Sequence, residues 1–387
     1  MKKIFSVLAV SFLALFALAG CDDGGSDSDT IRVGVNYGTT GPYATYGTSS
    51  VEGTKLAVKE INKNGGINGK KIELVEMDNK SDTNEAVNIA TKLTTEEDVV
   101  LTLGPEVSGN TKAAISVANK NKIPLISPSA TDDKVTVNKD GSVTEYGYKM
   151  CFNDSYQGKA LAQYAIAQGK TKAVIYGDSS SDYSKGLTKA FEEEFKKQNG
   201  TIVASENYVE GDTDFNAALT NIKGKDFDVL FIPGYYNEAG LIIKQARTQG
   251  INQMILGADG FDSPTLIELG GTENLKDVFF TTHFSIAEEN KDIDNFIAAY
   301  KDEFGKEPDA FAALGYDLGY YMADSIERAG DDITPETVNK ALSDTKAKFS
   351  GITGSFSMGK DHVPVKTIKI VELQAGEPVN VVNFDVK

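Results

Sequence analysis

The chain has 387 residues, of which 40% are hydrophobic and 25% are charged, a composition typical of a folded globular protein. Its formal net charge of −17 argues against nucleic acid and against an anionic membrane surface as partners, because both would repel it. The length that remains after the N-terminal segment predicts two domains.

The N-terminal segment is predicted to be a targeting signal rather than part of the fold. A pair of lysines precedes the apolar run Ile4–Ala19, which is shorter than the roughly 20 residues of a membrane-spanning helix. The run leads into Leu-Ala-Gly-Cys21, which resembles the bacterial lipobox, whose cysteine is lipidated. We therefore expect a lipoprotein signal peptide with a lipidated Cys21 over residues 1–21, and a flexible acidic tether over residues 22–29. The alternative is an ordinary secretory signal with a chance cysteine.

The first half of the remaining chain alternates predicted strands and helices. Runs of apolar and β-branched residues indicate strands, and apolar residues at i, i+3 and i+4 indicate helices. Residues 131–148 are polar and are expected to form a loop and a connecting strand. The other strands expected here are Thr30–Val35, Lys71–Met77, Val99–Leu103 and Ile123–Ile126. One helix is expected to end at Gly65-Gly66, and two others are expected at Glu85–Thr95 and Ala113–Ala118.

The same alternation restarts after Asn153 and then gives way to helices. Repeated strand–helix units with short linkers predict parallel sheets covered by helices on both faces. The strands expected here are Lys172–Tyr176, Thr201–Ala204, Val229–Ile232, Met254–Leu256, Val278–Thr281 and Thr367–Leu373, and the helices are Gln157–Ala167, Leu187–Phe195, Phe215–Ile222, Glu238–Gln249, Ile293–Phe304, Ala310–Ala329 and Pro335–Leu342.

Two polar loops follow neighbouring strands in the first half. Val107–Asn110 comes after the strand at Val99–Leu103, and Ser127–Thr131 comes after the strand at Ile123–Ile126. Open α/β sheets bind ligands at the carboxyl ends of their parallel strands. The loops offer hydroxyls and backbone N–H groups, and the first opens a helix whose N-terminus favours an anion. Serine, glycine and proline also make ordinary turns, so one such loop alone would not indicate a binding site. The prediction of a site therefore rests on the two loops together.

Motifs for catalysis and for metal binding do not occur in the sequence. The two histidines, His283 and His362, are far apart, and a zinc site needs more ligands than they supply. There is no GxSxG, HExxH, P-loop or GxGxxG pattern. We therefore expect no enzyme, no metal and no cofactor, although a carboxylate pair in a secreted glycosidase stays open. With Cys21 lipidated, Cys151 has no partner for an intrachain disulfide.

A series of short motifs runs through the chain. They are Gly41-Pro42 with Tyr46-Gly47, Gly65–Gly69, Ser108-Gly109, Ile126–Thr131, Cys151–Gly158, Asp182-Tyr183 with Gly186, Pro233–Tyr235 and Leu256–Gly260. In this order they resemble the type I periplasmic binding proteins of ABC importers, specifically the Leu/Ile/Val (branched-chain amino acid)-binding family. The resemblance covers essentially all of the chain after the N-terminal segment.

This resemblance implies an α/β fold of two Rossmann-like lobes joined by three hinge crossovers, with the ligand in the cleft between them. The crossovers are expected near Met150–Asn153, Thr281–Phe284 and Phe356–Lys360. The first lobe would comprise residues 30–150 and 283–357, and the second lobe would comprise residues 151–282 and 358–387.

The first lobe, by the same resemblance, would hold the head group of a free amino acid. Ser108 and the loop amides beginning at Val107 would bind the α-carboxylate. From the other side, the loop through Ser129, Ala130 and Thr131 would fix the head group with backbone groups and the Thr131 hydroxyl.

The second lobe would complete the site. Asp259 would pair with the α-ammonium, and Tyr183 and Tyr235 would close over the ligand, while Tyr46 and Phe311 would line the side-chain region. The chemistry agrees, because a buried zwitterion needs both of its charges paired. An aspartate before glycine is also a common turn residue, and aromatic residues in loops or on an apolar helix can simply belong to the core.

Glu106 departs from the residue pattern of proteins that bind an aliphatic ligand. It stands where the branched-chain binders carry an apolar residue at the pocket. A loop glutamate is usually exposed, and an outward Glu106 would leave an apolar pocket for an aliphatic amino acid, which is the outcome we expect. If Glu106 instead faced the cleft, it would favour a ligand whose side chain carries a donor.

The function expected from the sequence is therefore an extracytoplasmic, lipid-anchored substrate-binding protein that delivers a branched-chain or other aliphatic amino acid to the permease of an ABC transporter. The alternatives are the same fold binding a polar amino acid or another small carboxylate, or acting as a sensory ligand-binding module.

Overall fold

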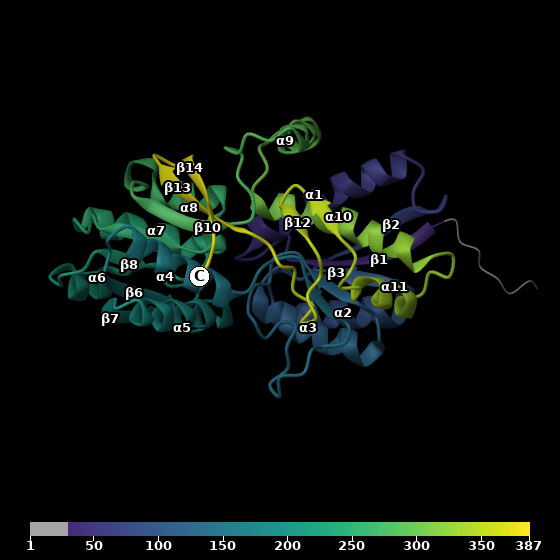
Figure 1. Ribbon diagram of the computed structural model, residues 1–387, viewed down its shortest axis with the longest axis horizontal. Coiled ribbons are helices and arrows are strands. Elements are labelled where there is room, and N and C mark those ends of the chain that lie inside the picture. The colour runs from purple at the N-terminus through teal and green to yellow at the C-terminus, as the bar shows by residue number, and fades with distance from the viewer. Residues whose placement is uncertain (1–29) are drawn as a thin grey trace, which may run out of the picture.

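The computed structural model describes residues 30–387 and has two lobes side by side (Figure 1). The expected signal peptide, Cys21 and the tether lie outside the described residues. Each lobe is built on a largely parallel sheet with helices packed on it, which confirms the α/β class and the two-lobed architecture. No helix within residues 30–387 is long and apolar enough to cross a membrane.

The first lobe contains a five-stranded sheet in the order β2-β1-β3-β4-β5, with every pair parallel. Its order places β3 and β4 side by side, so the two polar loops that follow them lie at one edge. The strands are β1 (Thr30–Tyr37), β2 (Lys71–Asp78), β3 (Leu101–Leu103), β4 (Leu125–Ser127) and β5 (Gly147–Lys149), and the helices are α1 (Ala44–Lys63), α2 (Thr83–Glu96), α3 (Ser108–Asn121), α10 (Ala310–Ala329) and α11 (Pro335–Leu342).

The second lobe contains a seven-stranded sheet in the order β14-β13-β10-β9-β8-β6-β7. The strands from β10 to β7 pair in parallel, whereas β13 and β14 are antiparallel additions at one side. The strands are β6 (Lys172–Asp178), β7 (Thr201–Tyr208), β8 (Val229–Phe231), β9 (Met254–Gly257), β10 (Val278–Thr282), β13 (Ile368–Gln374) and β14 (Glu377–Phe384), and the helices are α4 (Asp154–Ala167), α5 (Asp182–Lys197), α6 (Asn216–Lys223), α7 (Tyr236–Thr248) and α8 (Pro264–Gly270).

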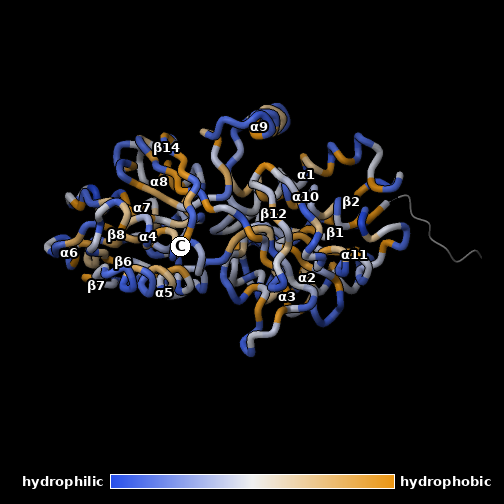
Figure 2. The backbone as a smooth tube through the Cα atoms, in the orientation of Figure 1, coloured by the Kyte–Doolittle hydropathy of each residue, from blue (hydrophilic) through white to orange (hydrophobic). Residues whose placement is uncertain are grey.

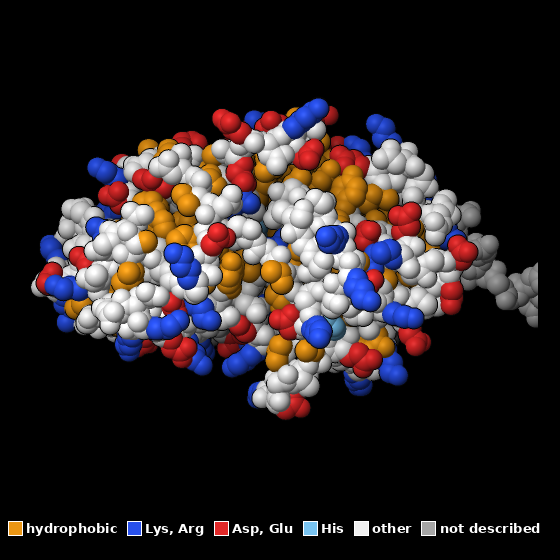
Figure 3. All heavy atoms as spheres, viewed as in Figure 1, with side chains coloured by type: hydrophobic (Ala, Val, Ile, Leu, Met, Phe, Trp, Pro, Cys, Tyr) orange, Lys and Arg blue, Asp and Glu red, His pale blue; other side chains and the backbone are white. Residues whose placement is uncertain are grey.

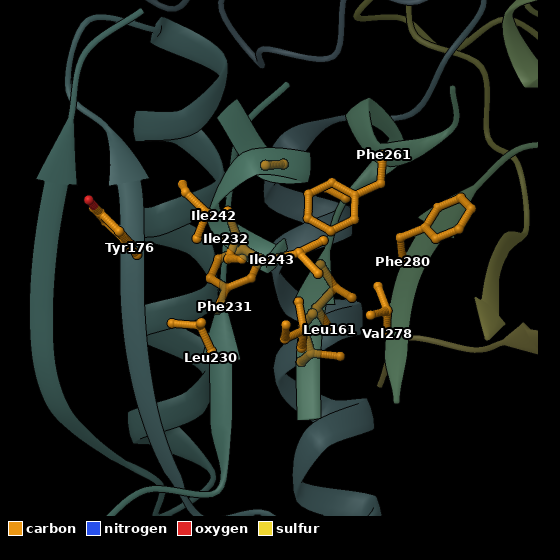
Figure 4. Close-up of a cluster of buried hydrophobic side chains, with 14 of the residues drawn as sticks. Leu161, Tyr176, Leu230, Phe231, Ile232, Ile242, Ile243, Phe261, Val278 and Phe280 are labelled. Carbon is orange, nitrogen blue, oxygen red and sulfur yellow. The ribbon is translucent and has the colours of Figure 1, made fainter. Parts of the chain in front are cut away.

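The cores follow the central strands. In the second lobe, buried side chains of β8 and β10 belong to one cluster with Ile242 and Ile243 of α7 (Figure 4). Figure 2 shows the hydrophobic stretches running through the interior of both lobes and hydrophilic stretches over the outer loops. On the face drawn in Figure 3, Lys and Arg side chains are interspersed with Asp and Glu, so the net negative charge is not gathered into one patch there.

Helices α1 and α10 make the closest packing in the first lobe. A Cβ on Gly53 would lie 2.0 Å from the Ala312 carbonyl oxygen, and a Cβ on Gly315 would lie 2.1 Å from the Ser50 carbonyl oxygen. Glycine is therefore required at both positions, because any side chain would push the two backbones apart. This contact fixes the C-terminal part of the chain onto the first helix.

Three connections join the two lobes. The first leaves β5 at Lys149 and enters α4 at Asp154, and the second leads from β10 to α9 (Lys291–Phe304). Helix α9, at the top of Figure 1, packs on α1 and α10 of the first lobe. The third follows the hairpin of β11 (Phe349–Gly351) and β12 (Gly354–Phe356) and ends at β13.

The third connection lies later in the chain than Phe356–Lys360, where we expected it. Met358 is still part of the first-lobe core, and the His362 ring stacks on Tyr148 of β5 with centroids 4.1 Å apart. The Lys149 N–H donates to the His362 carbonyl oxygen at 3.3 Å. The chain joins the second sheet only at Ile368, so the passage between the lobes lies at residues 363–367.

Candidate functional site

One small cavity between the lobes collects almost all of the residues that the sequence nominated. Its empty volume is about 230 Å³. Of the nominated residues, Ala130 is buried but does not line the wall, whereas Gly260 lines it and was not nominated. The lining residues are Tyr46, Glu106, Val107, Ser108, Ser129, Thr131 and Phe311 from the first lobe, and Tyr183, Tyr235, Asp259 and Gly260 from the second.

The first-lobe side of the cavity contains the N-terminus of α3. Val107 is the N-cap residue and provides no side-chain cap, so the first N–H groups of this helix are available to a ligand. The Ser108 hydroxyl accepts a hydrogen bond from the Asp132 N–H at 3.1 Å, which leaves its own proton free to donate. A helix N-terminus with an extra hydroxyl donor is suited to a carboxylate.

The loop after β4 borders the same end of the cavity. The Ser129 hydroxyl donates to the Glu106 carbonyl oxygen at 2.9 Å, so this side chain ties the two loops together. The buried Lys149 ammonium donates to the carbonyl oxygens of Thr131 and Asp132 at 3.1 and 3.0 Å and holds the end of the loop in place. The backbone of this loop is therefore a rigid part of the cavity wall.

Asp259 faces the cavity from the second lobe, at the start of a short 3₁₀ turn (Asp259–Phe261) after β9. Its Oδ1 accepts from Tyr183 Oη at 2.8 Å and from Gln157 Nε2 at 3.0 Å. Both side-chain donors meet Oδ1, which leaves Oδ2 free of side-chain donors within residues 30–387. Burial raises the pKa of Asp259 to about 6, against its hydrogen bonds, so the carboxylate carries its charge at neutral pH.

Aromatic rings form the remaining walls. Tyr46 stacks on Phe311 with centroids 4.1 Å apart, and Tyr183 stacks on Tyr235 at 4.8 Å with nearly parallel planes. Tyr46 and Tyr235 meet edge to face at 5.8 Å across the lobe boundary. Phe311 thus belongs to the cavity wall as well as to the core, and the rings supply apolar surface for a ligand side chain.

Glu106 does not turn outward, and our expectation of an exposed side chain was wrong. The residue is only 1% exposed, and its two carboxyl oxygens share the Gly38 N–H at 3.3 and 3.2 Å. Burial raises the pKa of Glu106 to about 7, and the nearby Asp78 carboxylate adds to the increase. The glycine-rich loop after β1, 68 positions earlier, provides the buried donor that local sequence reasoning could not anticipate.

Gln157 is a functional candidate that sequence reasoning missed. Besides holding Asp259 Oδ1, it accepts from the Asp259 N–H at 3.1 Å and from the Thr281 hydroxyl at 2.6 Å. It thereby sets the position of the acidic residue from α4. The only available signal was the motif around Cys151–Gly158, which contains Gln157 without revealing its partner.

The two lobes touch each other around the cavity. The Tyr46 hydroxyl donates to the Gly260 carbonyl oxygen, and the Tyr236 hydroxyl donates to the Pro42 carbonyl oxygen at 2.9 Å. At another point the Lys112 ammonium lies 2.7 Å from Asp132 in its own lobe and also pairs with Asp182 of the second lobe. The conformation is therefore a closed one, in which a ligand would be enclosed.

Metal ligands are not clustered in the described part of the chain. No group of three or more His, Cys, Asp or Glu side chains within residues 30–387 is arranged to hold an ion. Cys151 is a free, buried thiol.

Comparison with known proteins identifies the family. Residues 30–378 match the family model described as periplasmic binding protein. The structure is similar to the branched-chain amino acid transporter substrate-binding protein LivJ of Streptococcus pneumoniae in complex with isoleucine, at 41% identity and a TM-score of 0.86, covering 92% of this chain and 100% of that one.

Two further relatives agree with this match. The leucine-binding protein LivK of Thermotoga maritima is 32% identical, with a TM-score of 0.84 and coverage of 91% of this chain and 99% of that one. The Leu/Ile/Val-binding protein BraC3 of Rhizobium johnstonii is 30% identical over 89% of each chain. The motifs, the two lobes and these matches together show that the chain belongs to the periplasmic binding protein family, as a relative of branched-chain amino acid binding proteins.

Proposed function

We propose that this protein is an extracytoplasmic substrate-binding lipoprotein of an ABC transporter, which captures a branched-chain or other aliphatic amino acid in the interlobe cavity and delivers it to the permease. The observation that carries the proposal is the opposed pair of charge-binding groups in one closed, aromatic-walled cavity. The uncapped α3 N-terminus with Ser108 stands on one lobe, and Asp259 stands on the other.

An α-amino acid matches this arrangement group by group. Its carboxylate would take the N–H groups of α3 and the Ser108 proton, and its ammonium would take Asp259 Oδ2. Both ionic ends would then be paired on enclosure, which offsets the cost of removing them from water. The isoleucine bound by the S. pneumoniae relative supports an aliphatic side chain.

Isothermal titration of the purified protein against a panel of free amino acids tests the proposal. Isoleucine, leucine and valine should bind most tightly among ligands without a side-chain donor, and the amino acids with blocked amino or carboxyl groups should not bind. Binding of an amide-capped isoleucine as tight as that of isoleucine would contradict the assignment of the α3 N-terminus to the carboxylate.

Binding would also require the lobes to open and close, because the described conformation leaves no room for entry. We propose rotation about the three connections, with residues 150–153, 282–290 and 363–367 taking up the change. Small-angle scattering should give a smaller radius of gyration with isoleucine than without it. An unchanged radius in both states would argue that the free protein is already closed.

The lipid anchor is a separate proposal, which rests on the lipobox-like sequence before Cys21. Cys21→Ser should move the protein from the membrane fraction to the soluble fraction of cells. If the variant still sedimented with membranes, the anchor would lie elsewhere.

A further inference from the structure

A second cavity between the lobes, larger than the candidate ligand cavity, has one aspartate from each lobe on its wall. The start of α1 and the segment before α10 line it from the first lobe, and the turn after β9 and the start of α8 line it from the second. Asp309 belongs to the first of these sides and Asp262 to the second, and both are half-buried. The two carboxyls therefore face one space across the lobe boundary.

Side-chain hydrogen bonds hold each carboxyl within its own lobe. Asp309 is the N-cap of α10, where its Oδ1 accepts from the Ala312 N–H at 2.9 Å and its Oδ2 accepts from the Ser49 hydroxyl at 2.6 Å. Asp262 Oδ2 accepts from the Thr282 hydroxyl at 2.8 Å. The local structure of each lobe thus fixes one carboxyl, and only the closed arrangement of the lobes brings the two together.

The charged and titratable neighbours of this pair do not provide it with a cation of its own. The Lys306 ammonium favours the charged form of Asp309, but it also lies 2.8 Å from a Glu52 carboxylate oxygen. The neighbours are Glu52 of α1, Tyr300 of α9, Lys306 and Glu307 before α10, Glu377 of β14, and Asp259 on the same turn as Asp262.

The closed conformation makes the ionised forms of both carboxyls costly. Burial raises the pKa of Asp262 to about 7, and the negative charge of Asp309 adds to the increase. Burial also raises the pKa of Asp309 to about 6, against its hydrogen bonds and the Lys306 charge. Two carboxyls that share one partly dehydrated space do not both ionise readily, because each charge disfavours the other.

We propose that closure of the lobes takes up a proton on the Asp262–Asp309 pair, so that this pair couples ligand binding to protonation. The proposal rests on the proposed function, because it needs a ligand that closes the lobes. When the lobes separate, the carboxyls move apart and water reaches both, so each returns towards its ordinary pKa.

The sign of this coupling follows from the closed state binding the proton more tightly than the open state. The contribution of the pair to ligand affinity is present at low pH and is lost as the pH rises through about 7. Asp259 acts in the opposite direction, because it must be ionised to pair with the ligand ammonium. The two effects are separable, since Asp259 has its pKa at about 6 and is largely ionised above that pH.

Isothermal titration with isoleucine at pH 6.5 and pH 8 tests the proposal. For a pKa of about 7 in the closed state and an ordinary pKa in the open state, the ratio of Kd at pH 8 to Kd at pH 6.5 should be about fourfold larger in wild type than in Asp262→Asn. Asp309→Asn removes the repelling charge and keeps a good N-cap residue, so its ratio should lie between the two. Glu106 titrates in the same range, and the comparison with variants cancels its effect.

Counting protons provides a second measurement that a merely structural role would not change. Titrations at pH 7 in phosphate and in Tris, which differ in ionisation enthalpy, should show that wild type takes up more protons per isoleucine than Asp262→Asn does. Glu307→Gln is the matched control. Glu307 lines the same cavity but pairs with Lys301 at 2.7 Å within the first lobe, so this variant should keep the wild-type ratio and proton count.

The proposal is overturned if Asp262→Asn binds isoleucine with a Kd ratio within about 1.5-fold of wild type and the same proton count. That result would leave the proposed function standing. If Asp262→Asn folds poorly, Asp309→Asn decides by the same criterion. Absence of isoleucine binding by the wild-type protein at either pH would instead overturn the proposed function, and the coupling with it.

Discussion

Replacing Asp259 tests the central assumption about the site, which is that this carboxylate pairs with the ligand ammonium. In Asp259→Ala an enclosed ammonium would lose its charged partner. Removing one member of a buried charge pair costs about 2–5 kcal/mol, which corresponds to a loss of roughly 30- to 5,000-fold in Kd. Titration with isoleucine at pH 7.5 measures this loss directly.

The effect of Asp259 on folding stability provides the control. The folded pKa of Asp259, about 6, lies above the ordinary value of 3.8, so the folded state binds the proton more tightly than the unfolded state does. The contribution of Asp259 to the free energy of unfolding is therefore present at low pH and is lost as the pH rises between these two pKa values. The loss reaches about 3 kcal/mol above pH 6.

The isosteric Asp259→Asn should consequently unfold at no lower urea concentration than wild type at pH 7, although it binds isoleucine poorly. Wild-type affinity should itself fall below about pH 6, where Asp259 takes up a proton, and the asparagine variant should lack that fall. An intact fold with less than a threefold change in Kd for both variants would refute the pairing.

Three other variants examine separate parts of the site. Glu106→Gln should increase the free energy of unfolding by up to about 3 kcal/mol above pH 7, and the gain should vanish near pH 4.5, because the raised pKa makes the ionised carboxyl costly only at higher pH. Urea titrations at pH 4.5, 6 and 8 measure this gain. An effect that does not depend on pH would count against burial as its cause. Tyr46→Phe removes the hydroxyl that bonds to Gly260 across the lobes and should weaken isoleucine binding by roughly 2- to 12-fold, and unchanged affinity would show that this bond does not support closure. Lys112→Met should weaken binding by less than about 1 kcal/mol at low salt and by less still at 1 M salt, because its contact with Asp182 is partly exposed and screened; a loss that does not depend on salt would point to packing instead.

The sequence was sufficient for the fold because its strands and helices are strongly patterned. The strand predicted at Lys71–Met77 ends one residue short of β2, and the helix predicted at Ala310–Ala329 is the same as α10. The strand β14 was missed because its residues alternate irregularly between exposed and half-buried positions at the edge of the sheet. Helix α8 has only 7 residues, too few for a periodic pattern.

The candidate site was predictable where its residues lie in local motifs, and not where long-range partners decide the outcome. The loops at Ser108 and Thr131 stand directly after strands that pair in the sheet. By contrast, Glu106 is turned inward by Gly38, which is distant in sequence, and Asp259 is oriented by Gln157, which is 102 positions away. Nothing in the residues beside them identifies these partners, because they meet only once the strands are ordered.

The tight contact between α1 and α10 has a consequence for biosynthesis. The first lobe is assembled from two distant pieces of the chain, so the surface of α1 around Gly53 stays uncovered until Ala312 and Gly315 have been made. Contacts of such large sequence separation form slowly. A newly made chain would therefore remain incompletely folded until most of it has left the ribosome.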